Sequence, residues 1–147
     1  MRMSVVVRLG IGVLAMLNLC WGAWARLAPR HFFDTFPGFG RRWTAAYPPY
    51  NEHLVSDLGA TFLTLAFLLA VAAVMSDHRV ARVVLAGVLV FNALHLSFHA
   101  GHQGAMGPLD FGASLTALTA GVLVPALLLV LDLRTTKQNQ PVKPESG

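Results

Sequence analysis

Three histidines close one of the most apolar segments of this chain, and they are the residues best suited to chemistry. His95, His99 and His102 stand at the end of the segment VVLAGVLVFNALHLSFHAGH. Imidazoles are costly to place at membrane depth, so an ionisable cluster there points to a functional site. Spacings of four and three place all three rings, with Asn92 before them, on one stripe of a helix. The sequence therefore indicates a polar site at the end of this segment.

The spacing limits how these histidines could share a metal ion. On a helix, His95 and His99 are about 6 Å apart along the axis, which suits metal–nitrogen bonds of about 2.0–2.1 Å. His95 and His102 are about 10.5 Å apart along the axis, so one ion on all three would require a helix break near Gly101. Ligands from a second helix are the simpler solution. Mixed nitrogen and oxygen ligands suit zinc, iron, copper or manganese.

The composition predicts that these histidines belong to a membrane protein. Of 147 residues, 55% are hydrophobic and only 12% are charged, with a mean hydropathy of +0.58. A soluble domain would carry about twice that charged fraction. Several apolar runs approach the ~20 residues that cross a bilayer as a helix. We expect an all-α, four-helix transmembrane bundle over residues 1–134, with spans at about 5–28, 52–75, 81–100 and 110–133, and a disordered cytoplasmic tail at 135–147.

The basic residues predict the orientation of the bundle. They lie near the ends of the spans rather than along one stripe, which argues against nucleic acid as a partner. Seven on one side against four on the other favour both termini in the cytoplasm and a multi-pass location in the cell membrane. The seven are Arg2, Arg8, Arg79, Arg82, Arg134, Lys137 and Lys143, and the four are Arg26, Arg30, Arg41 and Arg42.

A cleaved signal peptide is the alternative for the first span. Arg2 and Arg8, the apolar run and Ala23-Trp24-Ala25 imitate such a segment. The apolar run is long for a signal peptide, and its removal would move the basic C-terminal region to the outer side. We therefore expect the first span to remain as a membrane anchor.

The first outer loop is expected to lie in the headgroup region. It reads HFFDTFPGFGRRWTAAYPPY and combines aromatic rings with arginines, as interfacial segments do. A short helix is expected around Arg41–Ala46. Asn51 is expected to cap the second span, with Glu52 and His53 in its first turn.

Topology places residues of the second span at the depth of the histidines. The second span starts at the outer face and the third span ends there. Polar stripes on two helices of one bundle are expected to face each other rather than lipid. The predicted site therefore has six candidate ligands for a transition metal ion, namely Glu52, His53, Asp57, His95, His99 and His102.

Simpler roles exist for several of these residues. His95 could be a packed histidine that bonds to a neighbouring helix, and His102 could be a solvated loop residue. Asp57 could neutralise Arg26 across the bundle or stabilise the start of its own helix. A haem would need a second deep histidine on another span. No role is assigned to the two loop histidines, His31 and His78.

Several short motifs have the form seen in one family. They are Arg8-Leu9-Gly10 at the start of the first span, Pro29 followed by Phe32 and Phe33, Gly59 in a second span with an acidic head, and a histidine late in the third span. Over about residues 5–131 the chain resembles the DoxX-like class of small four-span bacterial membrane proteins. PYNEHLVSDLGA with HLSFHAGH also resembles a group of uncharacterised actinobacterial membrane proteins. The DoxX-like class includes small subunits of a thiosulfate:quinone oxidoreductase and proteins tied to oxidative-stress complexes.

Together these observations predict a small integral membrane protein of redox-linked or accessory type, with an outward-facing His/Glu/Asp site that is a candidate for a metal ion. Such a metal would act as a Lewis acid or redox centre on a lipid-soluble substrate that enters between the helices. The expected partners are the lipid bilayer, a larger membrane or redox protein and a lipid-soluble small molecule. Two alternatives stay open: a non-enzymatic subunit that packs against a larger partner, and a small transporter or proton path.

Overall fold

The protein is built from four long helices and one structured loop. The computed structural model describes residues 3–138. In chain order the elements are α1 (Val5–Leu27), α2 (Pro29–Thr35), β1 (Pro37–Gly38), β2 (Arg41–Arg42), the 3₁₀ helix η1 (Thr44–Ala46), α3 (Glu52–Met75), α4 (His78–Gly101) and α5 (Pro108–Gln138).

Four of these helices, α1, α3, α4 and α5, are long and apolar enough to cross a membrane. The predicted all-α membrane protein with four spans is confirmed at this level. The helix α5 continues to Gln138, so it takes in the start of the predicted tail. Residues 139–147, where the rest of the disordered tail was predicted, lie outside the described part of the chain.

Polar side chains define where the spans begin. The Asn51 side chain accepts a hydrogen bond from the Leu54 N–H at 3.1 Å, which confirms the predicted cap of α3. Asp77 caps α4 by accepting the N–H groups of Arg79 and Val80 at 2.8 and 3.0 Å. These backbone bonds, that from Val80 first, lower the pKa of the Asp77 carboxyl below its usual 3.8. The α3–α4 connection is therefore a tight, capped turn.

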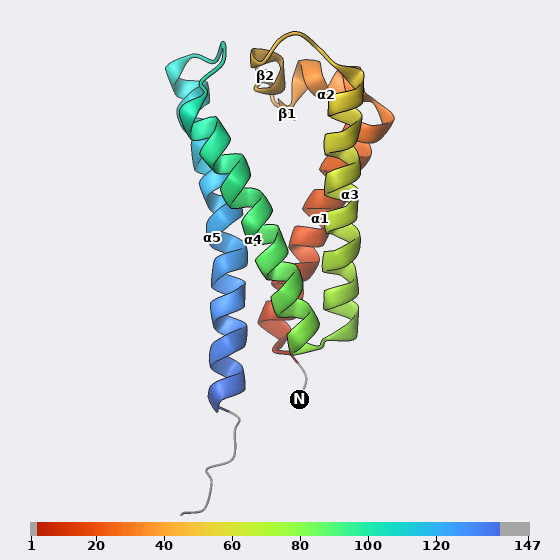
Figure 1. Ribbon diagram of the computed structural model, residues 1–147, viewed down its shortest axis with the longest axis vertical. Coiled ribbons are helices and arrows are strands. Elements are labelled where there is room, and N and C mark those ends of the chain that lie inside the picture. Colours follow the sequence, from red (N-terminus) through yellow and green to blue (C-terminus); the bar gives the residue numbers. More distant parts are fainter. Residues whose placement is uncertain (1–2, 139–147) are drawn as a thin grey trace, which may run out of the picture.

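The four spans form two pairs, α1 with α3 and α4 with α5, that meet at the end of the molecule where α1 begins and α5 ends. We call this the termini end. There the core contains Met3 and residues from all four spans: Val7, Ile11, Leu69, Ala72, Ala81, Leu85, Val88 and Leu128. Towards the opposite end, which carries the α1–α3 loop and the α4–α5 connection and which we call the loop end, the α4–α5 pair diverges from the α1–α3 pair (Figure 1).

The loop between α1 and α3 joins the two pairs at the loop end. Phe32 and Phe33 of α2 are buried against Ala25 and Val55, which fixes the loop on the α1–α3 pair. Its other side reaches the α4–α5 connection, where the Ala105 N–H donates to the Ala46 carbonyl at 2.9 Å. The short helix predicted around Arg41–Ala46 is wrong in its first part. Arg41 and Arg42 form strand β2, paired with β1, and only the 3₁₀ turn η1 is helical.

Candidate functional site

His95 and His99 of α4, with His102 at the C-cap of that helix, lie at the loop end, and a tyrosine from the α1–α3 loop joins them. The Tyr47 hydroxyl lies 2.9 Å from His99 Nδ1 and donates a hydrogen bond to the His102 carbonyl at 2.6 Å. The Tyr47 and His99 rings meet edge to face with centroids 5.1 Å apart. We call His95, His99, His102 and Tyr47 the His–Tyr cluster. Tyr47 is not among the site residues predicted from the sequence, and its only signal there is its place in an aromatic loop.

Gly104 lets the two loops approach closely enough to form this cluster. It has a positive φ of 61°, and a Cβ at this position would lie 2.6 Å from the Ala46 carbonyl oxygen. A Cβ would also lie 3.0 Å from the Tyr47 ring. Both the backbone conformation and the available space therefore favour glycine here.

The Tyr47 contacts determine which nitrogen of His99 carries the proton. A phenol has one proton, and the His102 carbonyl can only accept, so that proton lies between Tyr47 and the carbonyl. His99 must then donate through Nδ1 to the phenol oxygen, and neutral His99 has its lone pair on Nε2. Burial raises the pKa of the Tyr47 phenol above its usual 10.0, which preserves this arrangement at neutral pH.

His102 is held in the same tautomer by its own helix. Its Nδ1 lies 2.8 Å from the Phe98 carbonyl oxygen, which again can only accept. Its ring also stacks on Phe98, with centroids 4.3 Å apart and planes 9° from parallel. Both His99 and His102 thus offer an Nε2 lone pair when they are neutral.

His95 lies one turn deeper and has ring contacts instead of hydrogen bonds. It stacks on Phe91 with centroids 5.7 Å apart and meets the His99 ring at 4.7 Å. Within the described residues, the half-buried His95 ring takes part in no hydrogen bond. The bond to a neighbouring helix comes instead from Asn92, which donates to the Gly121 carbonyl of α5 at 2.9 Å. His95 therefore keeps its polar atoms available.

The predicted ligands on α3 lie apart from the His–Tyr cluster. Glu52, His53 and Asp57 are exposed, and His53 faces Asp57 on the same helix with Nε2 and Oδ2 3.4 Å apart. In the described part of the chain, no hydrogen bond, ion pair or ring contact joins these residues to the α4 histidines. The physical reason is the pairing of helices, because α3 packs on α1 while α4 packs on α5 (Figure 1).

The described residues contain no group of three or more His, Cys, Asp or Glu side chains that could hold a metal ion. The predicted metal site stays a prediction, with the adjacent His95 and His99 rings as its best-placed part. Asp57 forms no ion pair with Arg26 among the described residues, so no contact supports its alternative role of neutralising that arginine.

Asp110 at the start of α5 has two partners in the α1–α3 loop. Its carboxylate pairs with the Arg41 guanidinium and accepts a hydrogen bond from the Trp43 indole N–H at 3.2 Å. Both partners come from the α1–α3 loop. This contact and the Tyr47 contacts are two polar connections that hold the loop against the α4–α5 pair.

A second polar cluster lies at the termini end, and it gives a role to a histidine that had none. Asp132 of α5 is fully buried, with its carboxylate 2.6 Å from His78 Nδ1 and 2.7 Å from Arg82 Nε. The sequence signal for this contact is an acidic residue near the end of an apolar span, at the depth where the neighbouring helix α4 begins with His78 and Arg82. We call these three residues the Asp132 cluster.

Comparison with models of known protein families, with curated protein sequences and with solved structures gives no match for this chain. The DoxX-like resemblance therefore stays a hypothesis carried by the short motifs alone.

Proposed function

We propose that this chain is a small integral protein of the cell membrane, of redox-linked or accessory type, whose His–Tyr cluster binds a lipid-soluble molecule with a hydroxyl or carbonyl oxygen. One observation carries the proposal. His95 has no hydrogen-bond partner among the described residues, and it lies against His99, whose Nε2 lone pair is set by Tyr47. Leaving the nitrogens of a half-buried ring without a hydrogen bond costs free energy, so a ligand that bonds to His95 would be favoured.

The chemistry of the two rings specifies the ligand. His99 Nε2 accepts a hydrogen bond, as from a ligand hydroxyl. Neutral His95 has one donor and one acceptor nitrogen and can bond to a carbonyl or a hydroxyl. The flat rings of Phe91 and Phe98 beside them suit an aromatic head. A quinone or quinol fits this description, and the DoxX-like resemblance favours the redox-linked form of the proposal.

The orientation of the protein in the membrane is proposed from the position of its basic residues. Arg8, Arg79 and Arg82 lie at the termini end, which we place in the cytoplasm by the positive-inside rule. The His–Tyr cluster then faces outward, near the headgroup level of the outer leaflet. A lipid-soluble molecule would reach the cluster from the bilayer. If the protein is an accessory subunit, its larger membrane or redox partner would exchange electrons with that molecule.

A quinone-binding measurement tests this function. The purified protein in lipid nanodiscs is titrated with a decyl-substituted benzoquinone while tryptophan fluorescence is recorded. We expect saturable quenching in the wild type and about tenfold weaker binding in His99→Phe, because the hydrogen bond that orients the ring is lost. His53→Gln is the matched control, since His53 is an exposed histidine on α3, and it should bind like the wild type. Equal affinity in all three proteins would contradict the proposal.

A transition metal ion is a second candidate for the same cluster. The observation in its favour is the contact of the His95 and His99 rings at 4.7 Å, with an Nε2 lone pair on His99. We expect protein purified with zinc, and then freed of loose ions, to retain about one ion per chain and His99→Ala to retain none. Metal content at background in both proteins would leave the organic ligand as the only candidate.

A further inference from the structure

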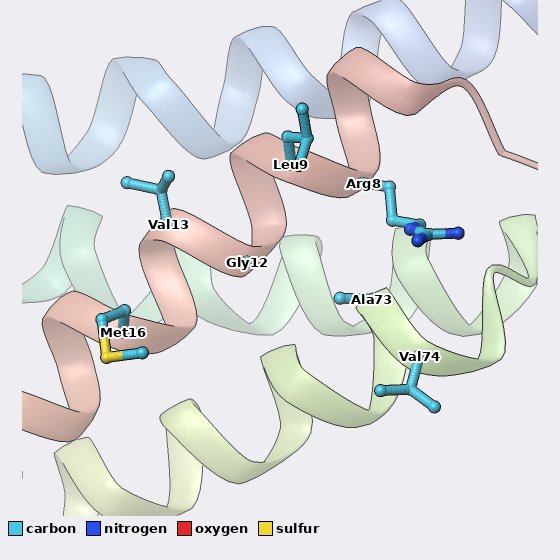
Figure 2. A pocket seen from close by; sticks show the side chains of 7 residues that line it. All are labelled: Arg8, Leu9, Gly12, Val13, Met16, Ala73 and Val74. Carbon is cyan, nitrogen blue, oxygen red and sulfur yellow. The ribbon is translucent and has the colours of Figure 1, made fainter.

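A groove on an exposed side of the α1–α3 pair combines apolar walls with one cation. Its volume is about 570 Å³. Figure 2 shows the Arg8 side chain at one end of the row of lining residues and Met16 at the other. The lining residues are Arg8, Leu9, Gly12, Val13 and Met16 of α1 with Ala73 and Val74 of α3.

Arg8 lies where a phospholipid headgroup would lie. It is in the first turn of α1, at the termini end, and is exposed. It forms no ion pair within residues 3–138. An arginine at a span end extends its guanidinium to the headgroup level, where phosphate is its natural counter-ion.

The groove below Arg8 has the form that an acyl chain needs. Gly12 and Ala73 line the bottom of the groove, and their small size leaves it open. A Cβ at Gly12 would meet no atom within 4 Å. Val13, Met16 and Val74 form exposed apolar walls. From Arg8 to Met16 the helix rises by about 12 Å, close to the depth of one hydrocarbon leaflet of about 15 Å.

We propose that this groove is a binding site for an anionic phospholipid of the leaflet at the termini end, with its phosphate on Arg8 and one acyl chain along Gly12 and Ala73. The charge of Arg8 selects an anionic headgroup over a neutral one. The charge of Arg8 also argues against a second copy of this chain as the occupant. A two-fold contact through this face would bring two Arg8 side chains to the same depth, where their positive charges would repel each other.

Native mass spectrometry of the detergent-solubilised protein tests the proposal, with phosphatidylglycerol and phosphatidylcholine as probes. We expect the wild type to prefer phosphatidylglycerol and Arg8→Gln to bind it about fivefold more weakly, with a smaller loss for phosphatidylcholine, whose choline cation offsets the phosphate charge. Arg134→Gln removes an exposed arginine near the same end outside the groove and should keep the preference. Gly12→Leu keeps Arg8 but fills the floor of the groove, and it should weaken the binding of both lipids.

Two results would overturn the lipid site. One is equal phosphatidylglycerol binding in the wild type and Arg8→Gln. The other is a dimer that Gly12→Leu abolishes, which would identify a second copy as the occupant. The quinone titration is expected to give the wild-type result in Arg8→Gln, so the lipid site and the proposed function can fail separately.

Discussion

Asp132→Ala is expected to lower the free energy of unfolding by about 3–5 kcal/mol, the largest loss expected from a single side chain in this protein. The carboxylate is fully buried and bonds to both His78 and Arg82. Its removal takes a buried carboxylate away from the mostly buried Arg82 guanidinium, so the desolvation of that charge is less well compensated. The measurement is unfolding by sodium dodecyl sulfate in mixed micelles, followed by circular dichroism.

The Arg30–Asp34 pair supplies the control for this prediction. Its Nε–Oδ2 distance is 2.7 Å, the same as that between Arg82 and Asp132, but Arg30 is exposed to solvent at 67% and Asp34 is partly exposed at 31%. Asp34→Ala should therefore change the free energy of unfolding by only about 0.3–0.5 kcal/mol. Asp132→Asn keeps one acceptor oxygen, so its loss in free energy of unfolding should lie between those of Asp132→Ala and Asp34→Ala. Similar losses for Asp132→Ala and Asp34→Ala would show that burial is not what makes the Asp132 cluster important.

Gly59→Val is expected to cost about 1–3 kcal/mol or more, because it separates α1 from α3. A Cβ at Gly59 would lie 2.7 Å from the Arg26 backbone nitrogen, and one at Gly22 would lie 2.8 Å from the Leu63 backbone nitrogen. Backbone atoms cannot move aside as side-chain ends can, so the helices themselves must shift. Small residues allow this kind of close approach between membrane helices.

The matched control is Gly87→Val on the exposed side of α4, where a Cβ would meet no atom within 4 Å. It should change stability by no more than about 0.5 kcal/mol. The same detergent titration measures both variants. A loss at Gly87 as large as that at Gly59 would assign the effect to valine in a helix rather than to the α1–α3 contact.

The difference between the predicted site and the His–Tyr cluster has one physical cause. Residue counts along a span give depth in the membrane, and by depth His53 and Asp57 belong with His99. Depth does not give lateral position. The glycines of α1 and α3 bring those two helices together, and the α3 carboxylate and imidazole stay on that pair, apart from the α4 histidines.

The features that depend on neighbouring residues along the chain could be predicted without the structure. These are the four apolar spans, the Asn51 cap and the histidine stripe, because hydropathy, capping and helical rise are local.

Three features became visible in the folded protein: the Tyr47 contact that sets the His99 tautomer, the burial of Asp132 between His78 and Arg82, and the groove beside Arg8. Each depends on which helices lie side by side and on the path of one loop. In a bilayer, where every span is apolar, that choice is made by the close packing of small residues and by a few polar contacts far apart in the sequence.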